Sequence, residues 1–226
     1  MGLLLVTILP SILIILFFVY SDKFKEPRGE IIKVFFYGIL ITIPAYFLNT
    51  YIGDFFYANT RVSENLISSF LTAAPVEEGL KLSVLYYLVY KMKDFNEPMD
   101  GIVYGVTVSL GFATYENYDY VFRLSEEFGV DPYQMAVWRS YSAIPMHGLM
   151  GCVMGFYFGL YAFTAKKKYI VLCLLIPFMI HGLYNFLPHP AHFMVLGVVI
   201  VYSIALHSQF KKMQINKKSE KQQKKI

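Results

Sequence analysis

The chain has 226 residues, of which 56% are hydrophobic and 16% are charged, whereas an average soluble domain is about 25% charged. With a mean hydropathy of +0.47, this composition excludes a string of soluble domains and predicts one compact bundle within a lipid bilayer. The two cysteines, Cys152 and Cys173, lie in apolar runs. This excludes a zinc ribbon or a secreted disulfide framework and predicts two buried thiols.

Seven apolar runs follow one another along the chain, each close to the length of about 20 residues that a membrane-spanning helix needs. The first run has no basic leader and no small-residue cleavage site, so we expect a retained helix rather than a signal peptide. Runs this long and this apolar favour helices over barrel strands. The predicted spans are residues 2–20, 34–53, 65–90, 101–122, 140–165, 169–188 and 193–210.

The predicted fold is therefore an all-α membrane protein, a bundle of about seven transmembrane helices that forms a single domain over residues 1–210. Of the basic residues, 16 lie in segments on one side of this bundle, and three (Arg61, Arg123 and Arg139) lie on the other. This asymmetry predicts an outside N-terminus and a cytoplasmic C-terminus. The lysine-rich residues 211–226 are then a basic cytoplasmic tail near anionic lipid. Without a folded basic platform, we expect no nucleic-acid partner.

The third predicted span carries ionisable residues near its centre, in the sequence "EEGLK". An ionised side chain inside a span costs about 2.5–3.5 kcal/mol, so it persists where it meets a partner or a cavity. Lys81 lies one helical turn from both Glu77 and Glu78 and can neutralise one of them. The other carboxylate can then act as a general acid or base. A structural ion pair is the alternative interpretation of this motif.

The next three predicted spans also carry polar residues. Glu116 and Asn117 lie in "GFATYEN", His147 lies in "IPMHG", and His181 and Asn185 lie in "HGLYN". At 1.5 Å per residue, the candidate acids and imidazoles lie about 9 to 18 Å below the outer ends of their spans. Taken singly, each of these residues also fits a buried histidine or an amide that joins two helices. Their common depth predicts one pocket that opens toward the outside.

Other polar or small residues are predicted to have structural roles. Asp100 and Asp119 lie near span ends, where capping or solvated side chains are expected. Residues 123–139 are either a solvated loop, which we favour, or a gate for the substrate. The fifth span contains a row of glycines that favours close packing between helices. These glycines are Gly148, Gly151, Gly155 and Gly159.

Together, the four motifs quoted above resemble the PrsW family of intramembrane proteases, which is distantly related to the CAAX prenyl proteases. The resemblance extends over about residues 1–210. It implies a multi-pass peptidase of the bacterial cell membrane that makes the first, site-1 cut in a membrane-anchored anti-sigma factor, on the extracytoplasmic side. A second intramembrane protease then releases the sigma factor in a stress response.

The resemblance also implies which residues form the site. The paired glutamates of the third span match the family's pair, and His181 and Asn185 match the His-x-x-x-Asn element of the CAAX-protease relatives. Those relatives have EExxxR, whereas this chain has Leu82 at the arginine position and a lysine one residue earlier. The role of their further histidine falls to either His147 or Glu116. The catalytic candidates are Glu77, Glu78, Glu116, His147, His181 and Asn185, with Lys81 and Asn117 in supporting roles.

Two hydrolytic mechanisms fit these candidates. In the first, one of the paired glutamates is the general base for a water that His147 or Glu116 holds, while His181 and Asn185 donate to the developing oxyanion. In the second, a zinc ion activates the water, and its ligands would be Glu77, Glu116, His147 and His181. The chain has no HExxH motif, which favours the mechanism without a metal cofactor.

Two functions from other classes also use charged residues inside spans. A proton-coupled transporter predicts internal repeats and access from both sides, but the two halves show no clear repeat and the polar groups cluster on one side. A non-catalytic membrane scaffold predicts that Glu77 and Glu78 tolerate replacement by glutamine. The protease hypothesis predicts loss of activity in at least one of these variants.

Overall fold

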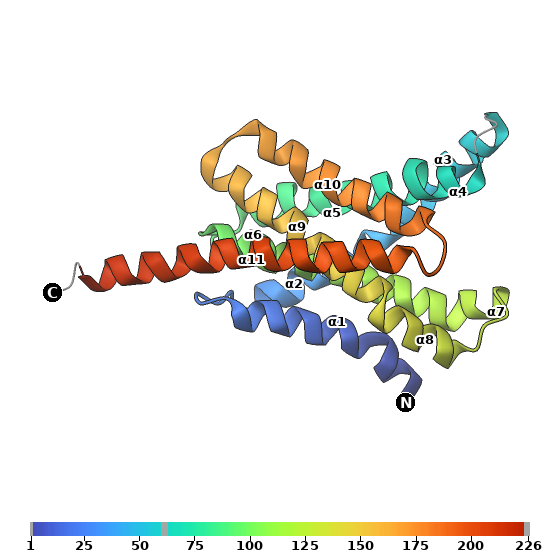
Figure 1. Ribbon diagram of the computed structural model, residues 1–226, viewed down its shortest axis with the longest axis horizontal. Helices are drawn as coiled ribbons and strands as arrows, with labels where there is room; N and C mark the ends of the chain where they lie inside the picture. The colour runs from blue at the N-terminus through green and yellow to red at the C-terminus, as the bar shows by residue number, and fades with distance from the viewer. Residues whose placement is uncertain (1, 60–62, 224–226) are drawn as a thin grey trace.

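The structure is a computed structural model that describes residues 2–59 and 63–223, apart from the side chains of residues 58, 59 and 217–223 (Figure 1). Arg61, which entered the orientation count, and the last lysines of the predicted tail lie outside these described residues. Every regular element in the described ranges is a helix. In chain order the elements are α1 (Gly2–Ser21), α2 (Arg28–Leu40), α3 (Thr42–Asn59), α4 (Glu64–Leu66), η1 (Ile67–Ala73), α5 (Ala74–Tyr87), η2 (Val89–Lys91), α6 (Pro98–Asp119), η3 (Tyr120–Leu124), α7 (Ser125–Glu127), α8 (Pro132–Tyr141), α9 (Ala143–Thr164), α10 (Lys167–Phe186) and α11 (His192–Gln223).

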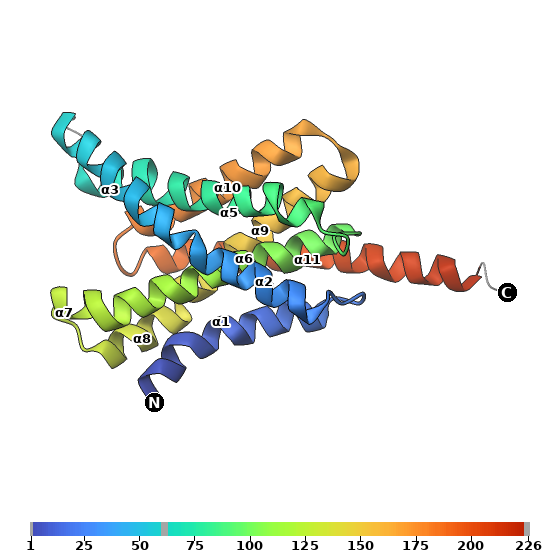
Figure 2. The ribbon, with the colours of Figure 1, turned by 180° about the vertical axis from the view of Figure 1, so that it is seen from behind.

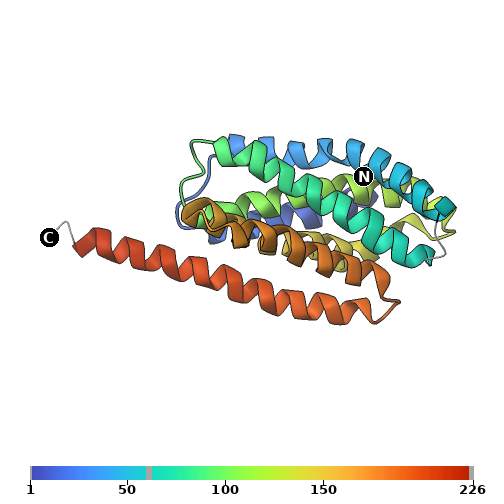
Figure 3. The same cartoon turned by 90° about the horizontal axis from the view of Figure 1, so that it is seen from above.

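The long helices run back and forth along one axis of the molecule (Figures 1 and 2). The N-terminus lies at one end of this axis, and α11 carries the chain beyond the opposite end. Seen from above, α11 lies at the edge of the bundle beside α10 (Figure 3). Five helical stretches of the described chain are long and apolar enough to cross a membrane. They are Gly2–Ser21, Arg28–Tyr57, Pro132–Thr164, Lys167–Phe186 and His192–Asn216.

The all-helical prediction is confirmed for the described residues, while the number of seven spans and the orientation stay predictions. The third and fourth predicted spans contain α5 and α6, which are not among the five apolar stretches. For α6 this has a structural reason, because α6 lies in the middle of the protein. All of its residues from Met99 to Thr114 are buried. A helix that is covered by other helices does not need a lipid-compatible surface.

The second predicted span is not one continuous helix. It divides between α2 and α3 at Ile41, close to Pro44. Proline has no N–H to donate to the carbonyl of Leu40, four residues earlier. Close by, the hydroxyl of Thr42 donates to the carbonyl of Ile39 at 2.6 Å. The sequence pattern missed this interruption because its residues are apolar on both sides of the break.

Glycines bring α6 and α9 into close contact, as the glycine row predicts. A Cβ atom added to Gly105 or to Gly151 would lie 2.5 Å from the carbonyl oxygen of the other residue. Gly155 faces Gly101 in the same way. Small residues allow the two backbones to approach directly, which is a common way to join helices in membranes. The prediction that Cys152 and Cys173 are buried, unpaired thiols is also confirmed.

This close packing fixes the position of the polar residues. Ser109 on α6 donates its hydroxyl to the backbone carbonyl of His147 on α9 at 2.8 Å. The helix α5 lies along the bundle on the side where α10 also runs (Figure 1). The helices α5, α6, α9 and α10 therefore bring the residues of the four sequence motifs to one region.

Candidate active site

Lys81 lies at the centre of a buried polar cluster. Its ammonium nitrogen lies 2.7 Å from Glu78 Oε1, 3.6 Å from Glu77 Oε2 and 3.1 Å from His147 Nδ1. The ring of Phe112 covers the same ammonium at 4.6 Å. Because an ammonium only donates hydrogen bonds, Nδ1 of His147 accepts here and its proton lies on Nε2. One cation thus holds groups from α5 and α9 together.

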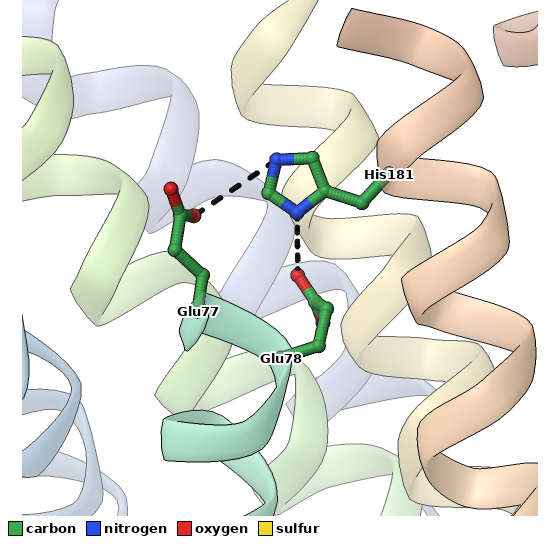
Figure 4. A group of neighbouring side chains, drawn as sticks. All are labelled: Glu77, Glu78 and His181. Carbon is green, nitrogen blue, oxygen red and sulfur yellow. Dashed lines mark hydrogen bonds and ion pairs between the residues drawn. The ribbon is translucent and has the colours of Figure 1, made fainter. Parts of the chain in front are cut away.

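His181 lies between the two glutamates, with one ring nitrogen toward each (Figure 4). Its Nδ1 lies 2.9 Å from Glu78 Oε1 and its Nε2 lies 4.0 Å from Glu77 Oε2. Glu78 Oε1 therefore accepts from both Lys81 and His181, which fixes its position. In the neutral imidazole, Nδ1 donates to Glu78 and the lone pair of Nε2 is directed toward Glu77.

A second chain of contacts starts from the other histidine. His147 Nε2 lies 3.1 Å from Glu116 Oε2, to which it donates. The guanidinium of Arg139 donates to the same oxygen at 2.6 Å and to Asn117 Oδ1 at 2.9 Å. The amide of Asn117 in turn donates to the backbone carbonyl of Thr7 on α1 at 2.7 Å. This series of hydrogen bonds connects α1, α6, α8 and α9.

A cavity of about 540 Å³ lies beside both chains of contacts. It reaches the surface near Arg123, whose side chain is 52% exposed. Glu78 and Lys81 lie behind its wall, since neither is among the residues that line it. The oxygen Oε2 of Glu77 is buried and has no hydrogen-bond partner among the described residues. The candidates on the cavity wall are Glu77, Glu116, His147, His181 and Asn185.

The structure brings most of the predicted site residues together, but only some of them line the cavity. Glu77 and Glu78 are adjacent in sequence, yet only Glu77 lines the cavity. Asn185 lies on the wall, whereas Asn117 is directed toward Arg139 and α1. Residues from different helices are in direct contact, which agrees with the single pocket inferred from their common depth. The helical structure before the fifth predicted span begins earlier than expected, in α8.

Sequence analysis missed Arg139, which it counted only as an outside basic residue. The segment 123–139, expected to be a solvated loop, is largely helical in η3, α7 and α8. Asp131 caps α8 by accepting from the backbone N–H of Gln134 at 2.9 Å, and Pro132 begins that helix. No local signal marked Arg139, because the helix is interrupted at Ser142, so helical spacing from His147 does not apply across the break. Both side chains nevertheless reach the same oxygen of Glu116.

The comparison with known proteins agrees with this constellation. A family model described as "PrsW family intramembrane metalloprotease" matches residues 26–207, which include every residue of the site. The chain belongs to the PrsW protease family. A protein named Protease PrsW from Geobacillus kaustophilus is 35% identical over 79% of this chain and 76% of its own length. The proteins of that name from Clostridioides difficile and Bacillus subtilis are each 34% identical, over 91% and 80% of this chain and 87% and 79% of their own lengths. No solved structure matches.

Membership in the PrsW family makes the chain a peptidase of the bacterial membrane and favours that class over a transporter or a scaffold. The family description includes a metal, and two groups of side chains in this site have suitable ligand atoms. Glu77, Glu78 and His181 place one ligand atom each within 4.8 Å of one another, and so do Glu77, Glu116 and His147. Glu77 belongs to both groups, and its Oε2 has no hydrogen-bond partner among the described residues. A mixed set of imidazoles and carboxylates fits a zinc-type ion.

Proposed function

We propose that this PrsW-family peptidase makes the site-1 cut in a membrane-anchored anti-sigma factor, on the extracytoplasmic side of the membrane. One observation carries the hydrolytic part of this proposal. The carboxylate oxygen Oε2 of Glu77 has no hydrogen-bond partner among the described residues and lies on the wall of a cavity, 4.0 Å from Nε2 of His181. The substrate and the side of the cut rest on the family resemblance and on the distribution of basic residues.

In the proposed mechanism, Glu77 is the general base. It removes a proton from a water in the cavity as the water oxygen attacks the carbonyl carbon of the substrate peptide. His181 enters the step as an imidazolium that has taken its proton from solvent and keeps it throughout, so that its Nε2–H and the amide of Asn185 donate to the oxyanion of the tetrahedral intermediate. Glu77 then returns the proton to the leaving amine. His147 and Glu116, which line the same cavity within 4.8 Å of Glu77, position the water.

The remaining site residues support this step from behind the wall. Glu78 accepts from Nδ1 of His181 and so presents Nε2 to the cavity. Such a carboxylate–imidazole pair fixes both the ring orientation and the tautomer. Lys81 balances the charge of the glutamates without entering the cavity. This division of roles supports Glu77, rather than Glu78, as the proposed base.

A metal-bound form of the same site is favoured by the family description and by the donor groups around Glu77. When bound, the ion would polarise the attacking water. Metal analysis of the purified protein, combined with chelation, distinguishes the two forms. One equivalent of zinc and activity that chelator removes and zinc restores support the metal-bound form. Full activity in a metal-free sample excludes it.

The proposed function is tested with the purified full-length protein in liposomes together with a single-span anti-sigma factor from the same genome. We expect cleavage at one position on the extracytoplasmic side of the substrate's span, which mass spectrometry of both fragments locates. A variant with Glu77→Gln is the control for contaminating proteases. Absence of cleavage by folded protein, or cleavage on the cytoplasmic side, would contradict the proposal.

Arg139 provides a separate prediction, because it donates to Glu116 and thereby positions His147. We expect Arg139→Gln to lower kcat of cleavage by about 10- to 100-fold, while KM changes little, because the arginine lies next to reacting groups rather than along an extended substrate. Arg123→Gln is the matched control. Its guanidinium pairs with Asp119 and Glu127 at the exposed rim, so we expect less than a twofold change. Equal effects of both replacements would contradict the positioning role.

A further inference from the structure

A second buried cluster of carboxylates lies far from the candidate active site. Asp22 and Glu26 belong to the connection between α1 and α2, and Asp100 lies in the first turn of α6. All three are buried, with exposed fractions of 3%, 6% and 0%. Each places a carboxylate oxygen within 4.8 Å of the others. Asp100 and Glu116 are 16 residues apart on α6, so the two sites are separated by about 24 Å.

Some oxygens of this cluster have partners within the protein. Oδ1 of Asp22 accepts from the backbone N–H of Phe24 at 3.0 Å and from the side-chain amide of Gln214 at 2.7 Å. Oδ2 of Asp100 accepts from two backbone N–H groups of the preceding turn, each at 2.7 Å. The hydroxyl of Tyr104 donates to Glu26. These contacts hold the three carboxylates in place from α6, α11 and the α1–α2 connection.

Two oxygens of the same cluster have no such partner. Oδ2 of Asp22 and Oδ1 of Asp100 are buried and have no hydrogen-bond partner in the described part of the chain. Burial removes such an oxygen from water, and no hydrogen bond from a described residue replaces the lost interaction. Buried polar groups that lack a partner commonly mark a site for a water or an ion. Two of them within one cluster indicate a ligand that both can reach.

The charge of the cluster is also uncompensated. Among the described residues, no lysine or arginine forms an ion pair with Asp22, Glu26 or Asp100. Lys25 lowers the energy of the charged Asp22, but it is exposed and its ammonium lies over the ring of Tyr20 at 4.8 Å. A positive ligand would offset the charge of these carboxylates.

We propose that Asp22, Glu26 and Asp100 bind Mg²⁺, a hard divalent cation. The available donors are all oxygens, and neither histidine nor cysteine is part of the cluster, which favours such a cation over zinc. Mg²⁺ typically keeps several waters beside a few carboxylates. A cavity of about 300 Å³ lies next to Gln214, which donates to Asp22, but none of the three carboxylates lines this cavity. The ion joins the α1–α2 connection to α6 and, through Gln214, to α11.

The test measures Mg²⁺-dependent stability of the purified full-length protein in detergent at pH 8.5, after treatment with chelator. We expect 10 mM Mg²⁺ to raise the melting temperature of the original protein by roughly 5 °C. Asp22→Asn keeps both hydrogen bonds of Oδ1 but removes the charge. We expect this variant to gain less than 1 °C with Mg²⁺, and to be at least as stable as the original protein in chelator.

Matched variants separate this site from others. Glu30→Gln removes a carboxylate at the same end of the bundle that pairs with Lys33 outside the cluster, so its Mg²⁺ response should be unchanged. Glu77→Gln should also keep the full response, because it changes only the candidate active site. Direct titration with Mn²⁺, followed by electron paramagnetic resonance, should find one bound ion that Asp22→Asn lacks and Glu77→Gln retains.

Three results would overturn the proposal. The first is a melting temperature of the original protein that does not respond to Mg²⁺, together with no bound Mn²⁺. The second is an equal response of the Asp22→Asn variant. The third is stabilisation by lowering the pH from 9 to 6 with no effect of Mg²⁺. A carboxyl whose pKa is raised by folding binds its proton more tightly in the folded state, so this last result would show that the cluster holds protons instead.

Discussion

Replacing Glu77 by glutamine is expected to lower kcat/KM for substrate cleavage by at least about 10³-fold, with the fold retained. Glutamine has nearly the same shape, but its amide cannot accept the proton of the attacking water, and general-base catalysis typically contributes 10²- to 10⁴-fold. If a metal is bound, the same replacement also removes the ligand that both candidate groups share. Both forms of the site therefore predict a large loss.

This loss is measured by single-turnover cleavage with purified protein, with the melting temperature as a check on folding. Glu64→Gln is the matched control, because Glu64 is an exposed carboxylate of α4, close to the start of the same predicted span. We expect this control to keep at least half of the original activity. A folded Glu77→Gln variant with more than a tenth of the original kcat/KM would exclude Glu77 as the base.

The second large effect is expected from Lys81→Met, which should lower the free energy of unfolding by about 3–5 kcal/mol. Lys81 is fully buried and contacts Glu77, Glu78 and His147. Without it, two buried carboxylates remain close together with no lysine or arginine beside them. Breaking one side of a buried ion pair typically costs this much, because the remaining charge is left uncompensated.

Denaturant unfolding of the single and double variants tests this explanation. Replacing both members of the pair, in Lys81→Met/Glu78→Gln, should restore at least half of the lost stability, because the uncompensated charge of Glu78 is then also removed. Its activity should stay low, since His181 loses the carboxylate that orients it. A double variant that is less stable than Lys81→Met would show that Lys81 acts mainly through packing and not through charge.

The helices and the list of polar candidates could be predicted from the sequence because both depend on local patterns. An apolar run of about 20 residues shows a span, and an ionised group within such a run is costly enough to indicate a partner or a cavity. This argument identified Glu116, His147 and His181 on three different helices, and the structure places each of them on one cavity wall. Their catalytic roles stay predictions.

Other features depend on packing that the sequence does not encode locally. Glu77 and Glu78 are adjacent, and successive residues of a helix differ by about 100° in direction, so the sequence cannot tell which one meets the cavity. Arg139 reaches Glu116 only because α8 continues toward α9 beside α6. Asp100 was expected to be a capping or solvated residue. It does cap α6, but it is buried because the α1–α2 connection and α11 cover it.

The central claim is that Glu77 and its partners share one water-accessible cavity that opens on the extracytoplasmic side. It is tested most directly by labelling single cysteines with a membrane-impermeant maleimide in right-side-out vesicles. The native Cys152 and Cys173 are buried and provide a low background. We predict rapid labelling of Asn185→Cys on the cavity wall, and protection of Glu78→Cys behind it. Labelling of Asn185→Cys only from the cytoplasmic side, or equal labelling of both variants, would contradict the account.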